Sequence, residues 1–114
     1  MNNPTISRHE LSELIETRAV TVVEALPASY FEQGHLPGAI NIPHTEVRAL
    51  APALLPDKDA AIVVYCANEP CPNSGIATHV LRKLGYTNVR DYAEGKADWT
   101  EAGLPLEQAT AVAG

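Results

Sequence analysis

Hydrophobic residues follow two spacings along the chain, one typical of buried strands and the other of helices. Nearly continuous apolar runs predict strands buried on both faces of a sheet, over residues 19–25, 39–42 and 60–65. A last strand is predicted over residues 88–92. Apolar residues three or four positions apart predict helices, over residues 8–17, 28–33, 45–54, 74–84 and 96–102. This alternation indicates an α/β fold with a central, mainly parallel sheet and helices on both faces.

Polar residues mark the ends of several of these elements. Ser7 and Glu10 are spaced as a capping box at the start of the first helix. Ser74 is expected to cap the helix that Gly85 ends. Glu24, at the end of an apolar strand, is anomalous. We expect its carboxylate to accept hydrogen bonds from backbone donors of neighbouring loops, with orientation of a pocket group as the alternative.

Length and composition suit one domain. The 114 residues are 46% hydrophobic and 19% charged, which is ordinary for a globular protein. We expect a single domain over residues 1–114, with a core of about 7–107 and a frayed tail of small residues over 109–114. The net charge is −6 and the 8 basic residues are scattered, which argues against a nucleic-acid partner.

Apolar runs are all too short to span a membrane, which takes roughly 20 residues. The first residues lack the charged and apolar regions of a secretion signal. The sequence therefore predicts a cytoplasmic protein with no membrane partner. In a reducing compartment, two nearby cysteines are more often catalytic, redox-active or metal-binding than structural.

Cys66 is the candidate nucleophile because it directly follows the strand predicted over 60–65. Ligands of open parallel sheets bind beyond the carboxyl ends of the strands. The residues after Cys66 form a candidate binding loop that leads into the next helix: Ala67, Asn68, Glu69, Pro70, Cys71, Pro72, Asn73 and Ser74. Backbone N–H groups and the positive end of that helix would stabilise a thiolate and any anion carried by its sulfur. The competing interpretation is a buried, inert cysteine that ends a core strand.

Five blocks of the sequence resemble the single-domain rhodaneses. They are Val22 to Glu24, Gly34 to Pro43, Ile62 to Cys66, Leu81 to Tyr86, and Gly95 to Trp99 with Gly103 to Pro105, in the family's order and spacing. The resemblance implies a rhodanese-like fold and transfer of sulfane sulfur through a persulfide on Cys66. It also implies that His35 is mainly structural and that Trp99 anchors the last helix in the core.

The chain departs from the family pattern around the expected site. The family commonly has Asp-Val-Arg after its second strand, where this chain has Glu24, Ala25 and Leu26, so the arginine is lost. Seven residues separate Cys66 from Ser74, more than is usual in the family, and none is basic. Related phosphatases and arsenate reductases close enlarged loops with an arginine, which disfavours both activities here. Asn68, Asn73 and Ser74 are the expected contacts for a bound sulfur species.

Cys71 adds a second chemical option. It is a candidate resolving thiol that could attack a persulfide on Cys66 and leave a disulfide; the alternative is a tolerated small residue between two prolines. We expect no metal site, because the four histidines lack paired ligand spacing, and no cofactor.

Three functional hypotheses follow. The first is a sulfurtransferase that takes sulfur from thiosulfate or a thiol persulfide and passes it to a thiol, to cyanide or to a protein acceptor. The second is a non-catalytic rhodanese-like binding or regulatory module. The third is a thiol-redox protein that uses Cys66 and Cys71.

Overall fold

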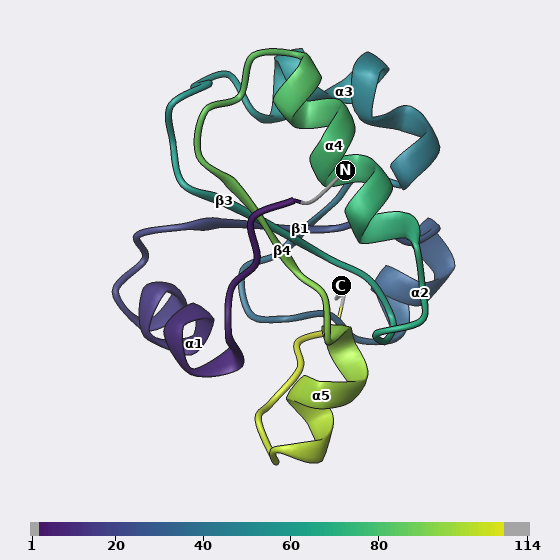
Figure 1. Ribbon diagram of the computed structural model, residues 1–114. Helices are drawn as coiled ribbons and strands as arrows, with labels where there is room; N and C mark the ends of the chain where they lie inside the picture. Colours follow the sequence, from purple (N-terminus) through teal and green to yellow (C-terminus); the bar gives the residue numbers. More distant parts are fainter. Residues whose placement is uncertain (1–2, 109–114) are drawn as a thin grey trace.

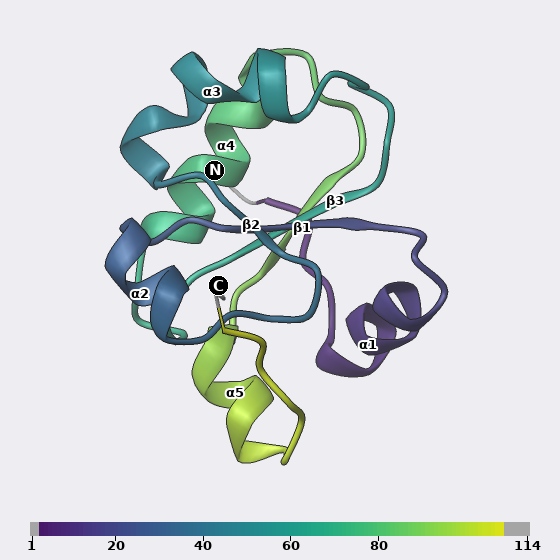
Figure 2. The same ribbon diagram turned by 180° about the vertical axis from the view of Figure 1, so that it is seen from behind.

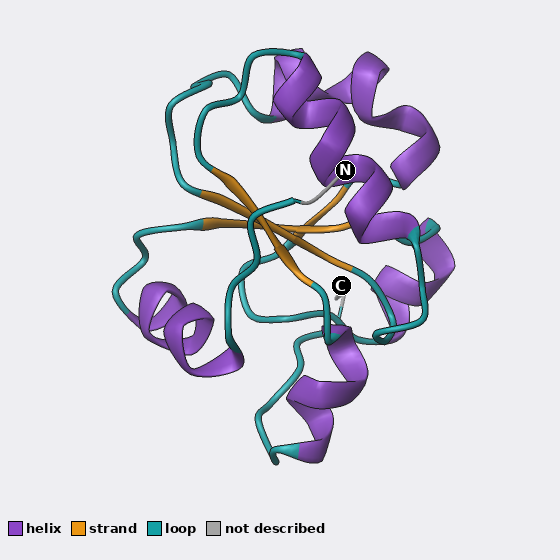
Figure 3. Cartoon of the chain, in the orientation of Figure 1, coloured by secondary structure: helices purple, strands orange, loops and turns teal. Residues whose placement is uncertain are grey.

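A computed structural model describes residues 3–108, so the predicted tail over 109–114 lies outside the described residues. The strands are β1 (Thr21–Glu24), β2 (Ile40–Asn41), β3 (Ile62–Tyr65) and β4 (Val89–Tyr92) (Figure 3). The helices are α1 (Arg8–Glu16), α2 (Ala28–Gln33), α3 (Val47–Leu54), α4 (Asn73–Lys83) and α5 (Gly95–Glu101), with a 3₁₀ turn, η1 (His44–Glu46).

The four strands form one sheet in the order β2-β1-β3-β4, and every pair is parallel. Helices α3 and α4 lie on one side of the sheet, and α1 and α5 lie on the other (Figure 1, Figure 2). The predicted α/β architecture is therefore confirmed. Parallel strands bring their carboxyl ends to one edge, so Glu24 and Tyr65 are neighbours there.

Successive strand residues contribute to two apolar clusters on opposite faces of the sheet. Val23, Ile62 and Val64 pack with Ala77 and Leu81 of α4. On the other face, Val22, Val63 and Tyr65 join a cluster that includes Leu11 of α1 and Trp99 of α5. All four residues of β3 are buried, as the unbroken apolar pattern predicts.

Several predicted ends need correction. The Ser7 hydroxyl accepts a hydrogen bond from the Glu10 N–H at 3.1 Å, as expected, but the Glu10 carboxylate pairs with Arg90 instead of completing the capping box. The helix expected over 45–54 is split into η1 and α3. Helix α4 begins one residue before Ser74, with Pro72 at its N-cap and no side-chain capping bond. Proline suits the start of a helix because the first backbone N–H groups of a helix have no intrahelical acceptor. The N–H that proline lacks is therefore not needed there.

In the part of the chain described here, none of the helices is both long enough and apolar enough to cross a membrane.

Candidate active site

Helix α5 fixes the start of the Cys66 loop. The Lys96 N–H donates to the Cys66 carbonyl at 2.9 Å, and the Ala97 N–H donates to the Ala67 carbonyl at 2.8 Å. Gly95 permits this contact: its φ is +73°, and a Cβ placed on it would lie 2.6 Å from the Cys66 carbonyl oxygen. The backbone on both sides of the cysteine sulfur is therefore held by β3 and α5.

The Cys66 sulfur is fully buried and faces hydrogen-bond acceptors as well as donors. Its thiol lies 3.3 Å from the Cys71 carbonyl and 3.5 Å from the Ser74 hydroxyl oxygen. Burial raises the pKa of the Cys66 thiol, and the neighbouring Cys71 thiol raises it further; the hydroxyl and backbone N–H of Ser74 lower it by a smaller amount. The expected anion cradle is only partly present, because a carbonyl occupies one side of the sulfur and only Ser74 contributes stabilising donors to it.

The other loop residues lie farther from the chemistry than expected. The Asn68 carbonyl accepts from the Cys71 N–H at 3.1 Å and lies 4.0 Å from the Cys66 sulfur. The Asn73 side-chain amide instead points to the Ala25 carbonyl, at 3.5 Å. Asn68, Glu69, Pro70 and Pro72 are exposed, whereas Ala67 and Cys71 are half-buried. Of the three predicted sulfur contacts, Ser74 alone brings its side chain to the sulfur in this arrangement.

Ser74 also lies beside a buried carboxylate that the sequence analysis did not select. Asp91 of β4 is 8% exposed, and its Oδ1 atom has no hydrogen-bond partner among the described residues. Burial raises the pKa of Asp91, and the Ser74 side chain lowers it by less. Ser74 does not act as the predicted helix cap, because α4 begins at Asn73 and the Ser74 hydroxyl faces the Cys66 sulfur.

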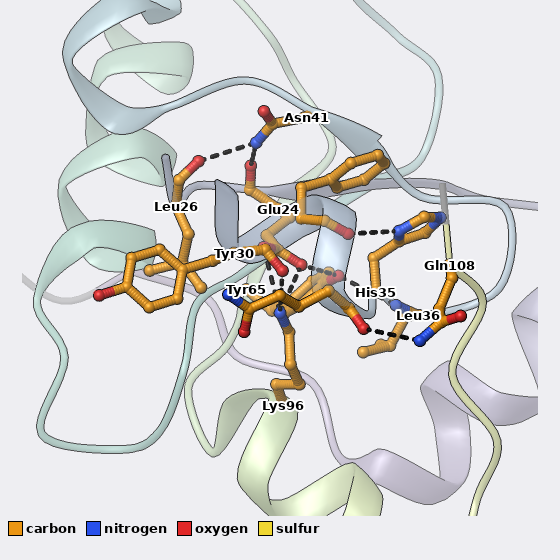
Figure 4. Close-up of polar contacts among 11 residues, drawn as sticks. Glu24, Leu26, Tyr30, His35, Leu36, Asn41, Tyr65, Lys96 and Gln108 are labelled. Carbon is orange, nitrogen blue, oxygen red and sulfur yellow. Dashed lines mark hydrogen bonds and ion pairs between the residues drawn. The ribbon is translucent and has the colours of Figure 1, made fainter. Parts of the chain in front are cut away.

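A second polar cluster surrounds Glu24 at the end of β1 (Figure 4). The Tyr65 hydroxyl donates to the Glu24 carboxylate at 2.6 Å and accepts from the Leu36 N–H at 3.0 Å. The Lys96 ammonium lies 3.1 Å and 3.2 Å from the two Glu24 carboxylate oxygens and 3.3 Å from the Tyr30 carbonyl. Burial and the Glu24 carboxylate raise the pKa of Tyr65 strongly.

The Glu24 prediction was therefore wrong. Its carboxylate accepts from the Tyr65 and Lys96 side chains and not from loop backbone, because both side chains reach the carboxyl edge of the sheet beside β1. Lys96 supplies the positive charge that the missing arginine would have placed near the acid. An ammonium has three protons, and three oxygens already surround this one.

His35 and Trp99 have the structural roles that were expected. The His35 ring stacks on Phe31 with the centroids 3.8 Å apart, and its Nδ1 lies 2.8 Å from the Phe31 carbonyl. Trp99 is 2% exposed, and its indole N–H donates to the Pro105 carbonyl at 2.9 Å.

The profile of the rhodanese-like domain matches residues 7–102. The chain belongs to the rhodanese-like domain family. A thiosulfate:glutathione sulfurtransferase from Homo sapiens is 31% identical over 111 residues, which cover 86% of this chain and 94% of that protein. The structure of a human single-domain sulfurtransferase superposes with a TM-score of 0.76 at 28% identity, covering 88% of this chain and 97% of that one.

Two further relatives are matched over only about half of their own length. An HTH-type transcriptional regulator from Mycobacterium tuberculosis is 36% identical over 107 residues, which cover 94% of this chain but only 46% of the regulator. A thiosulfate sulfurtransferase from Escherichia coli is 39% identical over 61 residues, with 54% of this chain and 57% of that protein covered. The matched segment thus spans about half the length of each of these two relatives, one of which is named as a regulator and the other as an enzyme.

Lys96, Tyr65 and Asp91 are the site residues that the sequence analysis missed. Asp91 carried only a weak signal, since it shares the strand over 88–92 with the polar Asn88 and Arg90. Lys96 and Tyr65 carried none, because each is an ordinary residue for its predicted element and its partner is distant in sequence.

Proposed function

We propose that the chain is a sulfurtransferase that carries sulfane sulfur as a persulfide on Cys66. The observation that carries this proposal is the position of the Cys66 sulfur, at the carboxyl end of β3 and against the Ser74 hydroxyl at 3.5 Å. Similarity to sulfurtransferases from Homo sapiens and Escherichia coli supports the same chemistry.

The reaction consists of two displacements at sulfur. The Cys66 thiolate attacks the outer sulfur of a thiol persulfide, the sulfur–sulfur bond of the donor breaks, and the donor leaves as a thiolate. An acceptor thiolate or cyanide then attacks the outer sulfur of the Cys66 persulfide and restores the Cys66 thiolate. No electron source is needed, because each bond that forms replaces one that breaks.

The charges around the loop favour a thiol persulfide over thiosulfate as donor. The loop contributes Glu69 and no cation, and the Lys96 ammonium is already held by Glu24 and the Tyr30 carbonyl. A thiosulfate dianion therefore meets little positive charge on approach. A thiol, cyanide or a protein cysteine serves as acceptor.

Comparison of donors tests this proposal. Purified protein would be given thiosulfate or glutathione persulfide, with cyanide or glutathione as acceptor, and turnover would be compared with that of Cys66→Ser. We expect turnover with both donors, faster with the persulfide, and none in the variant. Unchanged turnover in Cys66→Ser would exclude the mechanism. The absence of turnover with every donor would instead favour the inert module, for which the raised pKa of the buried thiol is the supporting observation.

Cys71 supports a second, redox function of the same loop. Its thiol neighbours Cys66 closely enough to raise the Cys66 pKa, and its carbonyl is 3.3 Å from the Cys66 sulfur. Attack of the Cys71 thiolate on the inner sulfur of a Cys66 persulfide would form a Cys66–Cys71 disulfide and release the outer sulfur as hydrosulfide. We expect Cys71→Ser to lengthen the lifetime of the Cys66 persulfide. Mass spectrometry in the absence of added acceptor measures this lifetime. An unchanged lifetime and no disulfide would leave Cys66 acting alone.

A further inference from the structure

Residues 3–6 form a short segment, here called the strap, that lies along the outer edge of β4. The Asp91 N–H donates to the Pro4 carbonyl at 2.8 Å, and the Ile6 N–H donates to the Asp91 carbonyl at 3.2 Å. Thr5 pairs with Asp91 as a parallel bridge, and Figure 1 shows the strap, in purple, passing β4 on its way to α1. Because β4 is last in the strand order, the strap covers backbone groups that an edge strand would otherwise expose.

The strap is also attached to the first turn of α4. The Asn3 side-chain amide donates to the Gly75 carbonyl at 2.9 Å. A Cβ placed on Gly75 would lie 3.7 Å from Asp91 Oδ2 and 3.8 Å from Asn3 Nδ2. The Asp91 carboxylate therefore lies next to both the strap and the start of α4, which follows the Cys66 loop directly.

The surroundings of Asp91 suit a neutral acid better than a charged one. Its side chain is 8% exposed, and its Oδ1 atom has no hydrogen-bond partner among residues 3–108. No lysine, arginine or histidine of these residues forms an ion pair with it. Two other buried atoms that can accept a hydrogen bond lack a partner in the described chain, Asn3 Oδ1 on the strap and Thr78 Oγ1 on α4. A neutral carboxyl brings an O–H donor to this region, whereas a carboxylate brings only acceptors.

We propose that Asp91 is a pH-sensitive latch for the strap: the neutral acid keeps the strap docked on β4 and α4, and the ionised acid favours its detachment. On ionisation the proton passes to solvent, and detachment lets water reach the carboxylate that remains. The cost is the loss of two backbone hydrogen bonds to Asp91 and of the bond from Asn3 to Gly75. Detachment exposes the edge of β4 and removes a tether from the start of α4, just after the Cys66 loop. The latch involves no sulfur chemistry and goes beyond the proposed function.

The direction of the pH effect follows from the two states. In the detached state Asp91 faces water and has its ordinary pKa, near 3.8, whereas burial raises its pKa in the docked state. The docked state therefore holds the proton more tightly, and it is favoured most at pH values below the ordinary pKa. Its advantage falls as the pH rises and stops changing above the docked-state pKa. Between these two pKa values, the equilibrium constant for detachment rises by up to about tenfold per pH unit.

Few other titratable groups face Asp91. The strap has none, and His79 is the titratable residue of α4 that lines the surface depression at the start of that helix. On β3 the neighbouring residue is Val64, and Cys66, which follows that strand, has its pKa raised away from the acidic range. Arg90 adjoins Asp91, but successive strand residues point to opposite faces, and its guanidinium forms an ion pair with α1 at 3.0 Å. A variant at His79 therefore serves as the control for a second titrating group.

Native-state hydrogen exchange, followed by NMR between about pH 3.5 and pH 8, tests the latch. The N–H groups of Ile6 and Asp91 report detachment, because both are bonded between the strap and β4. The Ala25 N–H, bonded to the Tyr65 carbonyl at 2.9 Å between two central strands, reports opening of the whole fold. Exchange rates are converted to protection factors, which removes the effect of pH on the exchange chemistry itself.

We expect the two strap N–H groups to be less protected than the Ala25 N–H at every pH, since the strap detaches on its own. Their protection factors should fall as the pH rises, by up to about tenfold per unit, until the pH reaches the Asp91 pKa. The carbon resonance of the Asp91 carboxyl group measures that pKa in the same samples.

Three variants assign the effect to Asp91. Asp91→Asn keeps the shape of the side chain but does not ionise, so its strap protection should be independent of pH and higher than that of wild-type protein at neutral pH. Glu32→Gln, at an exposed acid of α2, and His79→Gln should keep the wild-type dependence. If Asp91→Asn does not fold, the wild-type profile decides, because its fall has to end at the measured Asp91 pKa.

Three results would overturn the latch. One is strap protection that does not change with pH in wild-type protein. Another is a pH dependence that survives in Asp91→Asn or disappears in His79→Gln. The third is equal protection of the strap and Ala25 N–H groups, because the strap would then open only with the whole fold. Hydrogen exchange needs no sulfur donor, so failure of the donor assay would overturn the proposed function and leave the latch intact.

Discussion

Two buried carboxylates near the carboxyl edge of the sheet have opposite surroundings. Glu24, with 0% exposure, has the Tyr65 hydroxyl and the Lys96 ammonium as partners. Asp91, with 8% exposure, has no cation in the described structure and an unpartnered Oδ1. A carboxylate that has a cation and a hydroxyl as partners is held in place, whereas burial without a cation is unfavourable for the charged form. The comparison separates a carboxylate that ties α5 to β1 from one that is buried without a paired charge.

Glu24 is linked to Cys66 through one intermediate residue. Glu24 holds the Lys96 side chain, and the Lys96 N–H donates to the Cys66 carbonyl at 2.9 Å. Asp91 instead lies against the first turn of α4, since a Cβ placed on Gly75 would lie 3.7 Å from its Oδ2 atom. Variants at the two sites should therefore have different consequences.

Lys96→Ala should produce the largest loss of stability. It leaves the Glu24 carboxylate buried without its cation, and breaking one partner of a buried pair costs about 3–5 kcal/mol. Urea unfolding measures this loss. The double variant Glu24→Gln with Lys96→Met should recover most of it, and Lys83→Ala, at the exposed end of α4, should cost little. A Lys96→Ala cost as small as that of Lys83→Ala would show that Glu24 is not held by this pair.

Gly95→Ala should have the next largest effect. The new Cβ meets both a left-handed φ of +73° and the Cys66 carbonyl oxygen at 2.6 Å, so we expect a loss of about 2–4 kcal/mol. Gly103→Ala is the matched control, since its φ is +79° but nothing lies within 4 Å of the new atom; it should cost about 1 kcal/mol. Equal losses in the two variants, measured by urea unfolding, would mean that the close approach to Cys66 is unimportant.

Tyr65→Phe should cost about 2 kcal/mol, because the Leu36 N–H loses its acceptor and Glu24 loses a donor. Thermal and urea unfolding measure the change. Tyr30→Phe removes a hydroxyl from a side chain that is half exposed and should be nearly neutral. A neutral Tyr65→Phe would argue that the Glu24 cluster does not stabilise the fold.

Asp91→Asn should have the smallest effect on stability. It should stabilise the protein, whereas the other variants destabilise it. Burial raises the folded-state pKa of Asp91 above its ordinary value of 3.8. The folded protein therefore binds this proton more tightly than the unfolded chain does, and the stabilisation is lost as pH rises through the folded pKa. Asparagine does not titrate, so the variant should gain stability relative to the parent as the pH rises from about 4 through the folded-state pKa of Asp91. A relative loss as the pH rises, seen in urea midpoints, would contradict this account of Asp91.

Much of the fold could be predicted from the sequence because burial leaves a local pattern. The apolar run before Cys66 predicted β3, and the periodicity of Ala77 and Leu81 predicted α4. Ends were less accurate: Ser74 had the right residue type for a cap, but its hydroxyl faces the Cys66 sulfur at 3.5 Å instead. Tertiary contacts of this kind leave no local signal.

The site was predicted only in part for the same reason. Cys66 and its loop follow from strand order, because the carboxyl end of a parallel strand is where ligands bind. Whether N–H groups or carbonyls face the sulfur depends on single peptide orientations within the loop, which the sequence does not encode in any simple pattern. The pairing of Glu24 with Lys96 spans 72 residues, so it leaves no pattern in the local sequence.

The most direct test of the central claim is the intact mass of the protein after exposure to glutathione persulfide and removal of excess donor. We predict a mass gain of one sulfur atom on wild-type protein and on Cys71→Ser, lost on addition of cyanide or glutathione, and no gain on Cys66→Ser. Absence of the added sulfur from wild-type protein, or its presence at undiminished level in Cys66→Ser, would contradict the assignment of Cys66 as the sulfur carrier.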